Sequence, residues 1–181
     1  LDPGIGLFET MRVQADGAIA WRLQHRARLQ RSARALDFPT DADAIDAAID
    51  AAVSGLAGGV EHRLRIALDK AGHLTATSAV LEPLADGPVR VVLAATPLPE
   101  SERGLVGHKT TLRATYDAAL RDAQAAGAFD ALFFNARDEL TEGARTNVFV
   151  RLGGRWWTPP LACGLLAGVM RAHLLADPGL A

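Results

Sequence analysis

Residues 96–111 read TPLPESERGLVGHKTT and separate two parts of the chain that differ in character. Within this stretch, residues 96–107 hold two prolines, two glycines and three charged residues. That composition is typical of a connection between domains. We therefore predict an N-terminal lobe over residues 1–95, a linker over residues 96–107 and a C-terminal lobe over residues 108–181.

Lysine is scarce in this chain, which makes the lysine at the end of this stretch informative. The 19 basic residues are 17 arginines and two lysines, Lys70 and Lys109. Lys70 lies in the sequence Asp-Lys-Ala-Gly, which predicts a hairpin turn. Lys109 lies outside any amphipathic pattern. Because a primary amine forms an imine and a guanidinium does not, Lys109 is a candidate nucleophile, with a solvated surface lysine as the alternative.

On the N-terminal side, the sequence predicts strands that alternate with helices. Leu64, Ile66 and Leu68 share one face of a strand, and a turn at residues 70–72 joins that strand to the next in a hairpin. The expected strands are Gly6–Val13, His62–Asp69, His73–Leu81 and Val89–Ala95, and the expected helices are Leu23–Leu36 and Asp43–Leu56.

The C-terminal side has a similar mixture of elements. A turn at residues 136–139 should join its first two strands, and Trp156 and Trp157 should pack in the third. The expected strands are Asp130–Asn135, Asn147–Leu152 and Arg155–Thr158, and the expected helices are Leu112–Ala126 and Val169–Ala176. The whole pattern favours an α/β or α+β fold.

Composition excludes several classes of protein. Hydrophobic residues make up 49% of the chain and charged residues 22%, with a net charge of −2, so we expect a globular protein that does not bind nucleic acid. We see neither an apolar run long enough to span a membrane nor a signal peptide. Cys163 is the only cysteine, which favours a cytoplasmic location; we expect it in the core. The histidines have no metal-ligand spacing, so no metal site is expected.

Two stretches offer groups that suit a phosphate. His25, Arg28 and Ser32 fall on one face of their predicted helix, and a guanidinium binds a phosphate dianion by paired hydrogen bonds. That helix has several other arginines, so a solvated face is the alternative. Gly168 precedes the last helix, where the free amides of Val169 and Met170 suit an anion; an ordinary buried helix start is the alternative there.

Four segments taken together resemble the fold-type IV pyridoxal-phosphate enzymes, the class-IV aminotransferase family. That family includes branched-chain and D-amino-acid aminotransferases and aminodeoxychorismate lyase. The resemblance runs from Gly6 to Arg171 and implies a small N-terminal α/β lobe and a larger C-terminal lobe, which we expect to be incomplete here. The segments are His25-x-x-Arg28-Leu29-x-x-Ser32, the Lys109 loop, TEGARTNVF at residues 141–149 and LACGLLAGVMR at residues 161–171.

The resemblance also implies roles for individual residues. Lys109 would carry pyridoxal phosphate as a Schiff base, and Glu142 would keep the ring nitrogen of the cofactor protonated; a surface acid in a turn is the alternative for Glu142. Arg28, supported by His25, would bind the phosphate. The amides of Val169 and Met170 would bind it too, Asn147 with Arg145 and Thr146 would lie along the cofactor, and Phe8, Arg12 and Arg113 would meet the substrate.

Details of the resemblance favour one activity. The stretches GLFETMRV at residues 6–13, HKTT at 108–111 and residues 156–171, with Arg113 four residues after the lysine, resemble the lyase half of fused aminodeoxychorismate synthase–lyase proteins. We therefore expect a 4-amino-4-deoxychorismate lyase of folate biosynthesis that releases pyruvate and 4-aminobenzoate. A homodimer, and association or fusion with the synthase, are further expectations. The alternatives are a branched-chain or D-amino-acid aminotransferase and an inactive lobe that serves as a fusion or assembly partner.

Overall fold

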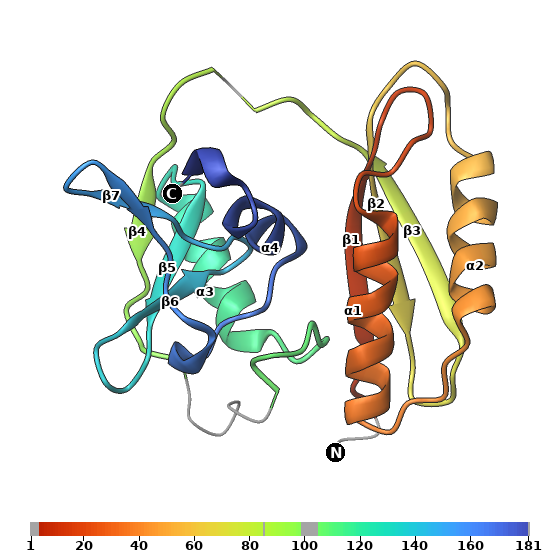
Figure 1. The fold of residues 1–181 in the computed structure, drawn as a ribbon, viewed down its shortest axis with the longest axis horizontal. Helices are drawn as coiled ribbons and strands as arrows, with labels where there is room; N and C mark the ends of the chain where they lie inside the picture. The colour runs from red at the N-terminus through yellow and green to blue at the C-terminus, as the bar shows by residue number, and fades with distance from the viewer. Residues whose placement is uncertain (1–3, 85, 99–104, 181) are drawn as a thin grey trace. The chain divides into compact units, whose positions relative to one another are not determined.

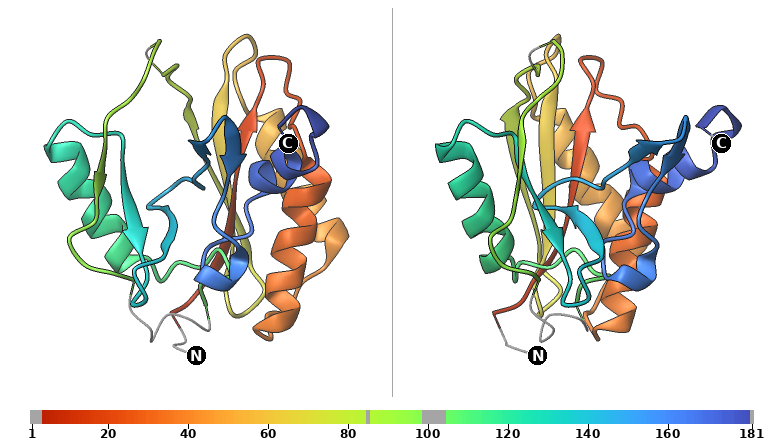
Figure 2. Two further views of the ribbon diagram at one scale, coloured as in Figure 1. Left: turned by 60° about the vertical axis from the view of Figure 1, so that its left-hand side comes forward. Right: turned by 90° about the vertical axis from the view of Figure 1, so that its left-hand side faces the viewer.

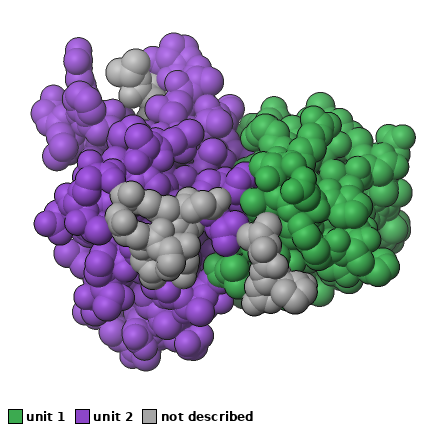
Figure 3. Space-filling model, turned by 90° about the horizontal axis from the view of Figure 1, so that it is seen from below, with its two compact units in different colours: residues 1–85, 109–112 green, residues 86–108, 113–181 purple. Residues whose placement is uncertain are grey.

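The computed structural model describes residues 4–84, 86–98 and 105–180. The chain divides into two compact units, coloured separately in Figure 3. Unit 1 comprises residues 1–85 and 109–112, and unit 2 comprises residues 86–108 and 113–181. The predicted linker falls partly on residues 99–104, which lie outside the described residues.

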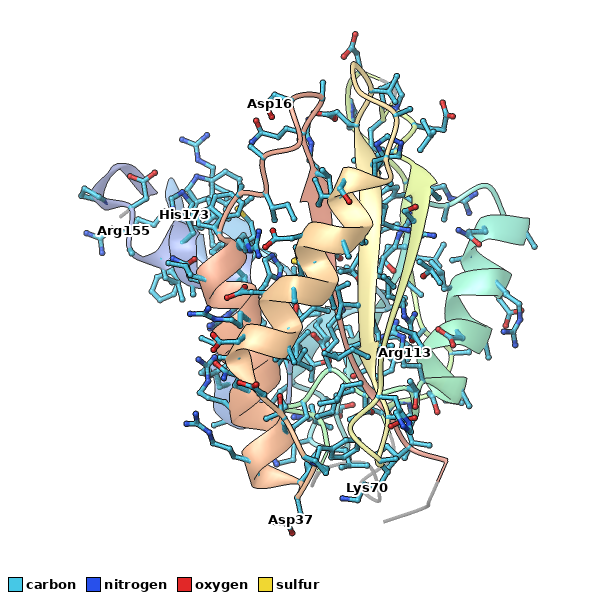
Figure 4. The ribbon with its side chains drawn as sticks, turned by 90° about the vertical axis from the view of Figure 1, so that its right-hand side faces the viewer. Asp16, Asp37, Lys70, Arg113, Arg155 and His173 are labelled. Atoms are coloured by element: carbon cyan, nitrogen blue, oxygen red, sulfur yellow. The ribbon has the colours of Figure 1, made fainter. Side chains whose placement is uncertain are left out.

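Unit 1 is an antiparallel three-stranded sheet with two helices on one face (Figures 1 and 4). The strands are β1 (Leu7–Val13), β2 (His62–Leu68) and β3 (Leu74–Val80), in that order across the sheet, and the helices are α1 (Arg22–Ala35) and α2 (Ala42–Ser54). The predicted strands and helices of this region are confirmed. Glu9 pairs with Ile66 and Met11 with Leu64 in the β1–β2 register, which places their side chains on the helix-covered face.

The core of unit 1 forms between that face and the helices. Its buried side chains include Leu7, Met11, Val13, Leu29, Ala33, Ile45, Ile49, Leu64, Ile66 and Leu68. Helix α2 begins where the sequence predicts, because the Asp41 side chain accepts a hydrogen bond from the amide of Asp43 at 3.1 Å. In β2, buried residues alternate with more exposed ones. The buried residues mark the face of the sheet that α1 and α2 cover.

A segment from beyond the predicted linker also belongs to unit 1. Residues Lys109–Leu112 lie along the outer edge of β1. The amide of Phe8 donates to the carbonyl of Lys109 at 2.9 Å, and the amide of Thr111 donates to the carbonyl of Gly6 at 2.8 Å. Leu7 and Thr110 pair across this edge, so Lys109 is held beside Phe8.

Unit 2 contains a mixed three-stranded sheet and a two-stranded hairpin. Strand β4 (Val91–Leu93) is parallel to β5 (Asp130–Phe134), which is antiparallel to β6 (Leu140–Gly143). Helix α3 (Ala114–Ala125) lies along this sheet, as Figure 2 shows. The hairpin strands are β7 (Val150–Leu152) and β8 (Arg155–Trp157), and helix α4 (Val169–Leu175) follows a short 3-10 helix at Leu161–Cys163.

Four expectations for unit 2 are wrong. The turn after β5 leads to β6, which was not predicted because four residues are too few to show a period of two. The strand expected from Asn147 begins only at Val150, and it pairs with β8. Trp156 and Trp157 lie in β8 but are 48% and 55% exposed, and Cys163 is only partly buried, because these segments lie outside the core around β5.

None of the helices formed by the described residues is long and apolar enough to cross a membrane.

Candidate active site

Lys109 lies against an aromatic ring on β1. Its Nζ atom is 4.8 Å from the centroid of the Phe8 ring, and the Arg65 guanidinium carbon is 3.7 Å from the same centroid. Phe8 is buried, whereas Lys109 is partly exposed. Lys109 and Arg65 therefore share one aromatic ring, and the structure brings the predicted nucleophile and the predicted substrate residue Phe8 together.

The other lysine has a structural position. The Lys70 Nζ donates to the carbonyls of Leu36 and Asp37 at 2.6 and 2.9 Å, and it lies 4.3 Å from the Phe38 ring centroid. Figure 4 labels Lys70 and Asp37 near one end of unit 1. Because carbonyls at the end of a helix lack intrahelical partners, Lys70 stabilises the end of α1. Lys70 thus has a structural role, whereas Lys109 lies beside Phe8 at the edge of β1.

Arg28 forms a buried ion pair on the helix side of β1. Its Nε atom donates to Glu9 Oε1 at 2.7 Å and its second terminal nitrogen donates to Glu9 Oε2 at 2.5 Å. His25 Nδ1 lies 2.8 Å from Glu9 Oε2. Burial raises the pKa of Glu9, but hydrogen bonds from His25 and Arg28 and their charge outweigh it, so the pKa lies below its ordinary value.

Neighbouring strand residues point in opposite directions, and this separates two of the predicted site residues. Glu9, which pairs with Arg28, faces α1, whereas Phe8, which contacts Lys109, faces away from it. The side chains of Arg28 and Lys109 therefore approach β1 from opposite faces. His25 and Arg28 do share a face of α1, as predicted, and both reach Glu9.

Glu142 lies in the middle of β6 and is 7% exposed. Its Oε1 atom accepts a hydrogen bond from the Tyr116 hydroxyl at 2.9 Å. Its Oε2 atom accepts one from the amide of Leu166 at 3.1 Å, and the Asn147 side-chain amide lies 3.5 Å from the same oxygen. A buried carboxylate needs such donors to offset its loss of solvent, so Glu142 is no surface acid.

Asn147 connects Glu142 to the start of α4. Its side-chain amide also donates to the carbonyl of Leu166 at 3.0 Å, and its Oδ1 atom occupies the space that a β-carbon on Gly168 would need. A larger residue at that position would displace the Asn147 side chain. Helix α4 then begins with Val169, which is buried, and Met170, which is half-exposed.

Arg145 and Thr146, which follow Glu142 in the chain, form hydrogen bonds at the start of β5. The Thr146 hydroxyl donates to Asp130 Oδ2 at 2.7 Å, and the Arg145 side chain donates to the carbonyl of Phe129 at 2.6 Å. Asp130 is completely buried. Arg145 and Thr146 therefore fix the loop that carries Asn147.

The two arginines expected to meet the substrate both have protein partners. Arg12 is exposed and pairs with Glu61 through two of its nitrogens, at 2.5 to 3.0 Å. Arg113, labelled in Figure 4, donates to the carbonyl of Ala144 at 2.5 Å, and its Nε lies 3.4 Å from Asp117. Their roles toward a substrate remain proposals.

Sequence reasoning missed three buried partners of the predicted residues. Glu9 occupies an inward position between Leu7 and Met11, and an acid on a buried face indicates a cationic partner; that signal was available. Tyr116 is the only tyrosine in the chain, and Asp130 begins a buried strand. In neither case does the sequence indicate which residue the side chain contacts.

The family model described as amino-transferase class IV matches residues 6–178, almost the whole chain. The chain belongs to the class IV aminotransferase family. A Schizosaccharomyces pombe protein called "Putative aminodeoxychorismate lyase" is 32% identical over 174 residues, which are 94% of this chain and 73% of that protein. The resemblance seen in the four sequence segments is therefore confirmed.

Solved structures of family members agree with this assignment. The crystal structure of a "Putative amino-acid aminotransferase" from Mesorhizobium loti is 39% identical with a TM-score of 0.87, covering 98% of this chain and 84% of that one. A hypothetical aminotransferase from Mycobacterium tuberculosis is 27% identical with a TM-score of 0.77, covering 94% and 66%. It has been solved with PLP bound, and with α-ketoglutarate and PMP bound.

This class IV chain is thus a pyridoxal-phosphate enzyme, an aminotransferase or a lyase, with the expected α/β fold. The residues present fit the cofactor by their chemistry. Lys109 offers an amine for an aldehyde and Glu142 a buried carboxylate for a protonated ring nitrogen, whereas the guanidinium of Arg28 is paired with Glu9. At Gly168 the Asn147 side chain occupies the space that a β-carbon would need.

Proposed function

We propose that this class IV enzyme is a 4-amino-4-deoxychorismate lyase that forms 4-aminobenzoate and pyruvate for folate biosynthesis. The observation that carries the proposal is the Schizosaccharomyces pombe relative named for this activity, which aligns with 94% of the chain. The sequence from His108 to Arg113, which resembles the lyases, supports it independently. A partly exposed amine at Lys109 beside the Phe8 ring supplies the group that the reaction needs.

The proposal assigns the cofactor to named residues. Lys109 binds it covalently, Glu142 accepts a hydrogen bond from its protonated ring nitrogen, and Arg28 with the amides of Val169 and Met170 binds its phosphate. Asn147 fixes Glu142 and the start of α4 relative to each other. When bound, pyridoxal phosphate supplies an electron sink that stabilises negative charge on the carbon next to the substrate nitrogen.

Lys109 then moves a proton between two carbons of the substrate. Its amine, released when the substrate's amino group takes its place, takes the proton from the ring carbon that bears the amino group. The bond between the neighbouring ring carbon and the ether oxygen breaks, and a new double bond makes the ring aromatic. Lys109 returns the proton to the methylene carbon of the departing enolpyruvate, which gives pyruvate. No oxidant or amino acceptor is consumed.

The neighbours of Lys109 favour this use of its amine. The Arg65 guanidinium contacts the same Phe8 ring, so the amine of Lys109 lies beside a ring that is itself held in place. Phe8, Arg12 and Arg113 are proposed to contact the substrate.

An amino-acid aminotransferase is the second candidate, because the Mesorhizobium loti structure is 39% identical to this chain. The Mycobacterium tuberculosis structure with α-ketoglutarate bound gives the acceptor to test. This activity uses the same lysine and glutamate but consumes one 2-oxo acid for each amino acid. The two activities therefore differ in stoichiometry.

One assay separates the candidates. The purified holoenzyme is incubated with 4-amino-4-deoxychorismate without a 2-oxo acid, and 4-aminobenzoate and pyruvate are measured by chromatography, with Lys109→Ala as the control. We expect equal amounts of the two products from the wild type and none from the variant. Transfer of an amino group from branched-chain or D-amino acids to α-ketoglutarate, without 4-aminobenzoate formation, would reject the lyase proposal.

The proposal extends to assembly and location. We propose a cytoplasmic homodimer that acts with, or fused to, aminodeoxychorismate synthase. Sedimentation of the purified chain at several concentrations measures the dimer directly, and a monomer at every concentration would contradict it.

A further inference from the structure

We infer that Tyr116 is a positioning residue that sets the Glu142 carboxylate for the ring nitrogen of the cofactor. The inference rests on the proposed role of Glu142. Neither the family resemblance nor the named relatives assign a role to Tyr116. It acts through Glu142 and is not itself assigned any contact with cofactor or substrate.

The hydrogen bond that carries the inference is short and buried. The Tyr116 hydroxyl donates to Glu142 Oε1 at 2.9 Å, and the two residues are 9% and 7% exposed. A hydrogen bond between a hydroxyl and a carboxylate is stronger in such surroundings than in water. Tyr116 thus restrains Oε1 of Glu142, whereas the amide of Leu166 binds Oε2.

Packing fixes the direction from which the hydroxyl approaches. The Tyr116 ring meets the Phe133 ring edge-to-face, with centroids 5.0 Å apart and an angle of 61°. The Arg113 guanidinium carbon lies 5.1 Å from the centroid of the Tyr116 ring. Since Phe133 is completely buried, the tyrosine ring is held from the core side, and helix α3 thereby delivers a fixed donor to β6.

The consequence is electrostatic as well as geometric. When a buried carboxylate loses a hydrogen-bond donor, desolvation favours its protonated form. A protonated carboxyl group no longer stabilises a proton on a ring nitrogen. The Tyr116 hydroxyl therefore supplies one of the donors that hold the Glu142 carboxylate in place.

Cofactor binding tests this without any substrate. Apoenzyme is titrated with pyridoxal phosphate and with its 1-deaza analogue, in which a C–H group replaces the ring nitrogen, and the two Kd values are measured by absorbance. The ratio of the two constants reports the contact between Glu142 and the ring nitrogen. We expect Tyr116→Phe to reduce the preference for pyridoxal phosphate about tenfold, the size of one charge-assisted hydrogen bond, while binding of the analogue stays close to wild type.

Thr141 offers a matched control. Its buried hydroxyl donates to the carbonyl of Phe133 at 3.0 Å, one residue from Glu142 but without contacting it. Thr141→Val removes a comparable buried hydrogen bond and should leave the Kd ratio unchanged. If Tyr116→Phe weakens binding of both cofactors equally, Tyr116 is only structural and the inference is overturned.

A second variant separates this inference from the proposal beneath it. Glu142→Gln should abolish the preference for pyridoxal phosphate; if it does not, the role of Glu142 itself is wrong and the inference fails with it. The 4-aminobenzoate assay is independent of the ratio. If the enzyme proves to be an aminotransferase but its Kd ratio still depends on Tyr116, the lyase proposal is rejected and the inference about Tyr116 is supported.

Discussion

Glu9 and Arg28 form a bidentate ion pair in which both side chains are buried, at 2% and 6% exposure. The pair joins β1 to α1, and His25 contacts the same carboxylate. In the sequence these residues are 19 positions apart. Because Arg28 is the proposed phosphate ligand, Glu9 determines where that guanidinium lies.

The first prediction concerns the stability that this pair supplies. Glu9→Gln leaves a buried guanidinium without its counter-charge, so we expect the free energy of unfolding to fall by about 3 kcal/mol, measured by urea denaturation. The control is Glu61→Gln, which breaks the exposed pair with Arg12 and should cost under about 1 kcal/mol. Equal losses in both variants would contradict the prediction.

The second prediction is a dependence of stability on pH. The pKa of Glu9 in the folded protein lies below its ordinary value of 4.5. Its contribution is therefore fully present above that ordinary value and is lost as the pH falls through the lower folded-state pKa. Urea unfolding of wild type and Glu9→Gln from pH 7 to pH 3 should show the wild-type advantage shrinking only in acid. An advantage that grows toward low pH would show that the sign is wrong.

The third prediction distinguishes the two lysines chemically. Borohydride reduction of the holoenzyme, followed by digestion and mass spectrometry, should place the cofactor on the Lys109 peptide. Lys109→Ala should be colourless. Lys70→Ala should stay yellow and lose about 1 kcal/mol of stability, because two carbonyls near the end of α1 lose their donor. A cofactor adduct on Lys70 would refute the assignment.

The fourth prediction uses the glycine that follows Glu142. A β-carbon on Gly143 would collide with the Asp130 carboxylate and the Thr146 hydroxyl. Gly143→Ala should therefore lower the free energy of unfolding by about 2 kcal/mol and weaken cofactor binding, since β6 must shift. Gly58→Ala is the control, because a β-carbon there meets nothing within 4 Å; it should change stability by less than about 1 kcal/mol. Unchanged cofactor affinity in Gly143→Ala would contradict the prediction.

Much of the fold follows from local patterns. Helices α1, α2, α3 and α4 and the β2–β3 hairpin lie close to their predicted positions, because their periodicity, caps and turn residues act over a few neighbouring positions. Strand β6 was missed, although it carries Glu142. It has four residues, and its pairing with β5 is set by that neighbour and not by its own sequence.

For the candidate site, the sequence by itself determined which groups are present: two lysines, Arg28 among the arginines of α1, the glutamate before Gly143 and the glycine before α4. The tertiary structure decided what each one contacts. It assigned Lys70 to helix carbonyls, Lys109 to the Phe8 ring, Arg28 to Glu9 and Glu142 to Tyr116. The reason is physical: a buried charge must find its partner wherever the chain brings one, and those partners lie up to about 100 positions away along the chain, beyond the reach of any local pattern.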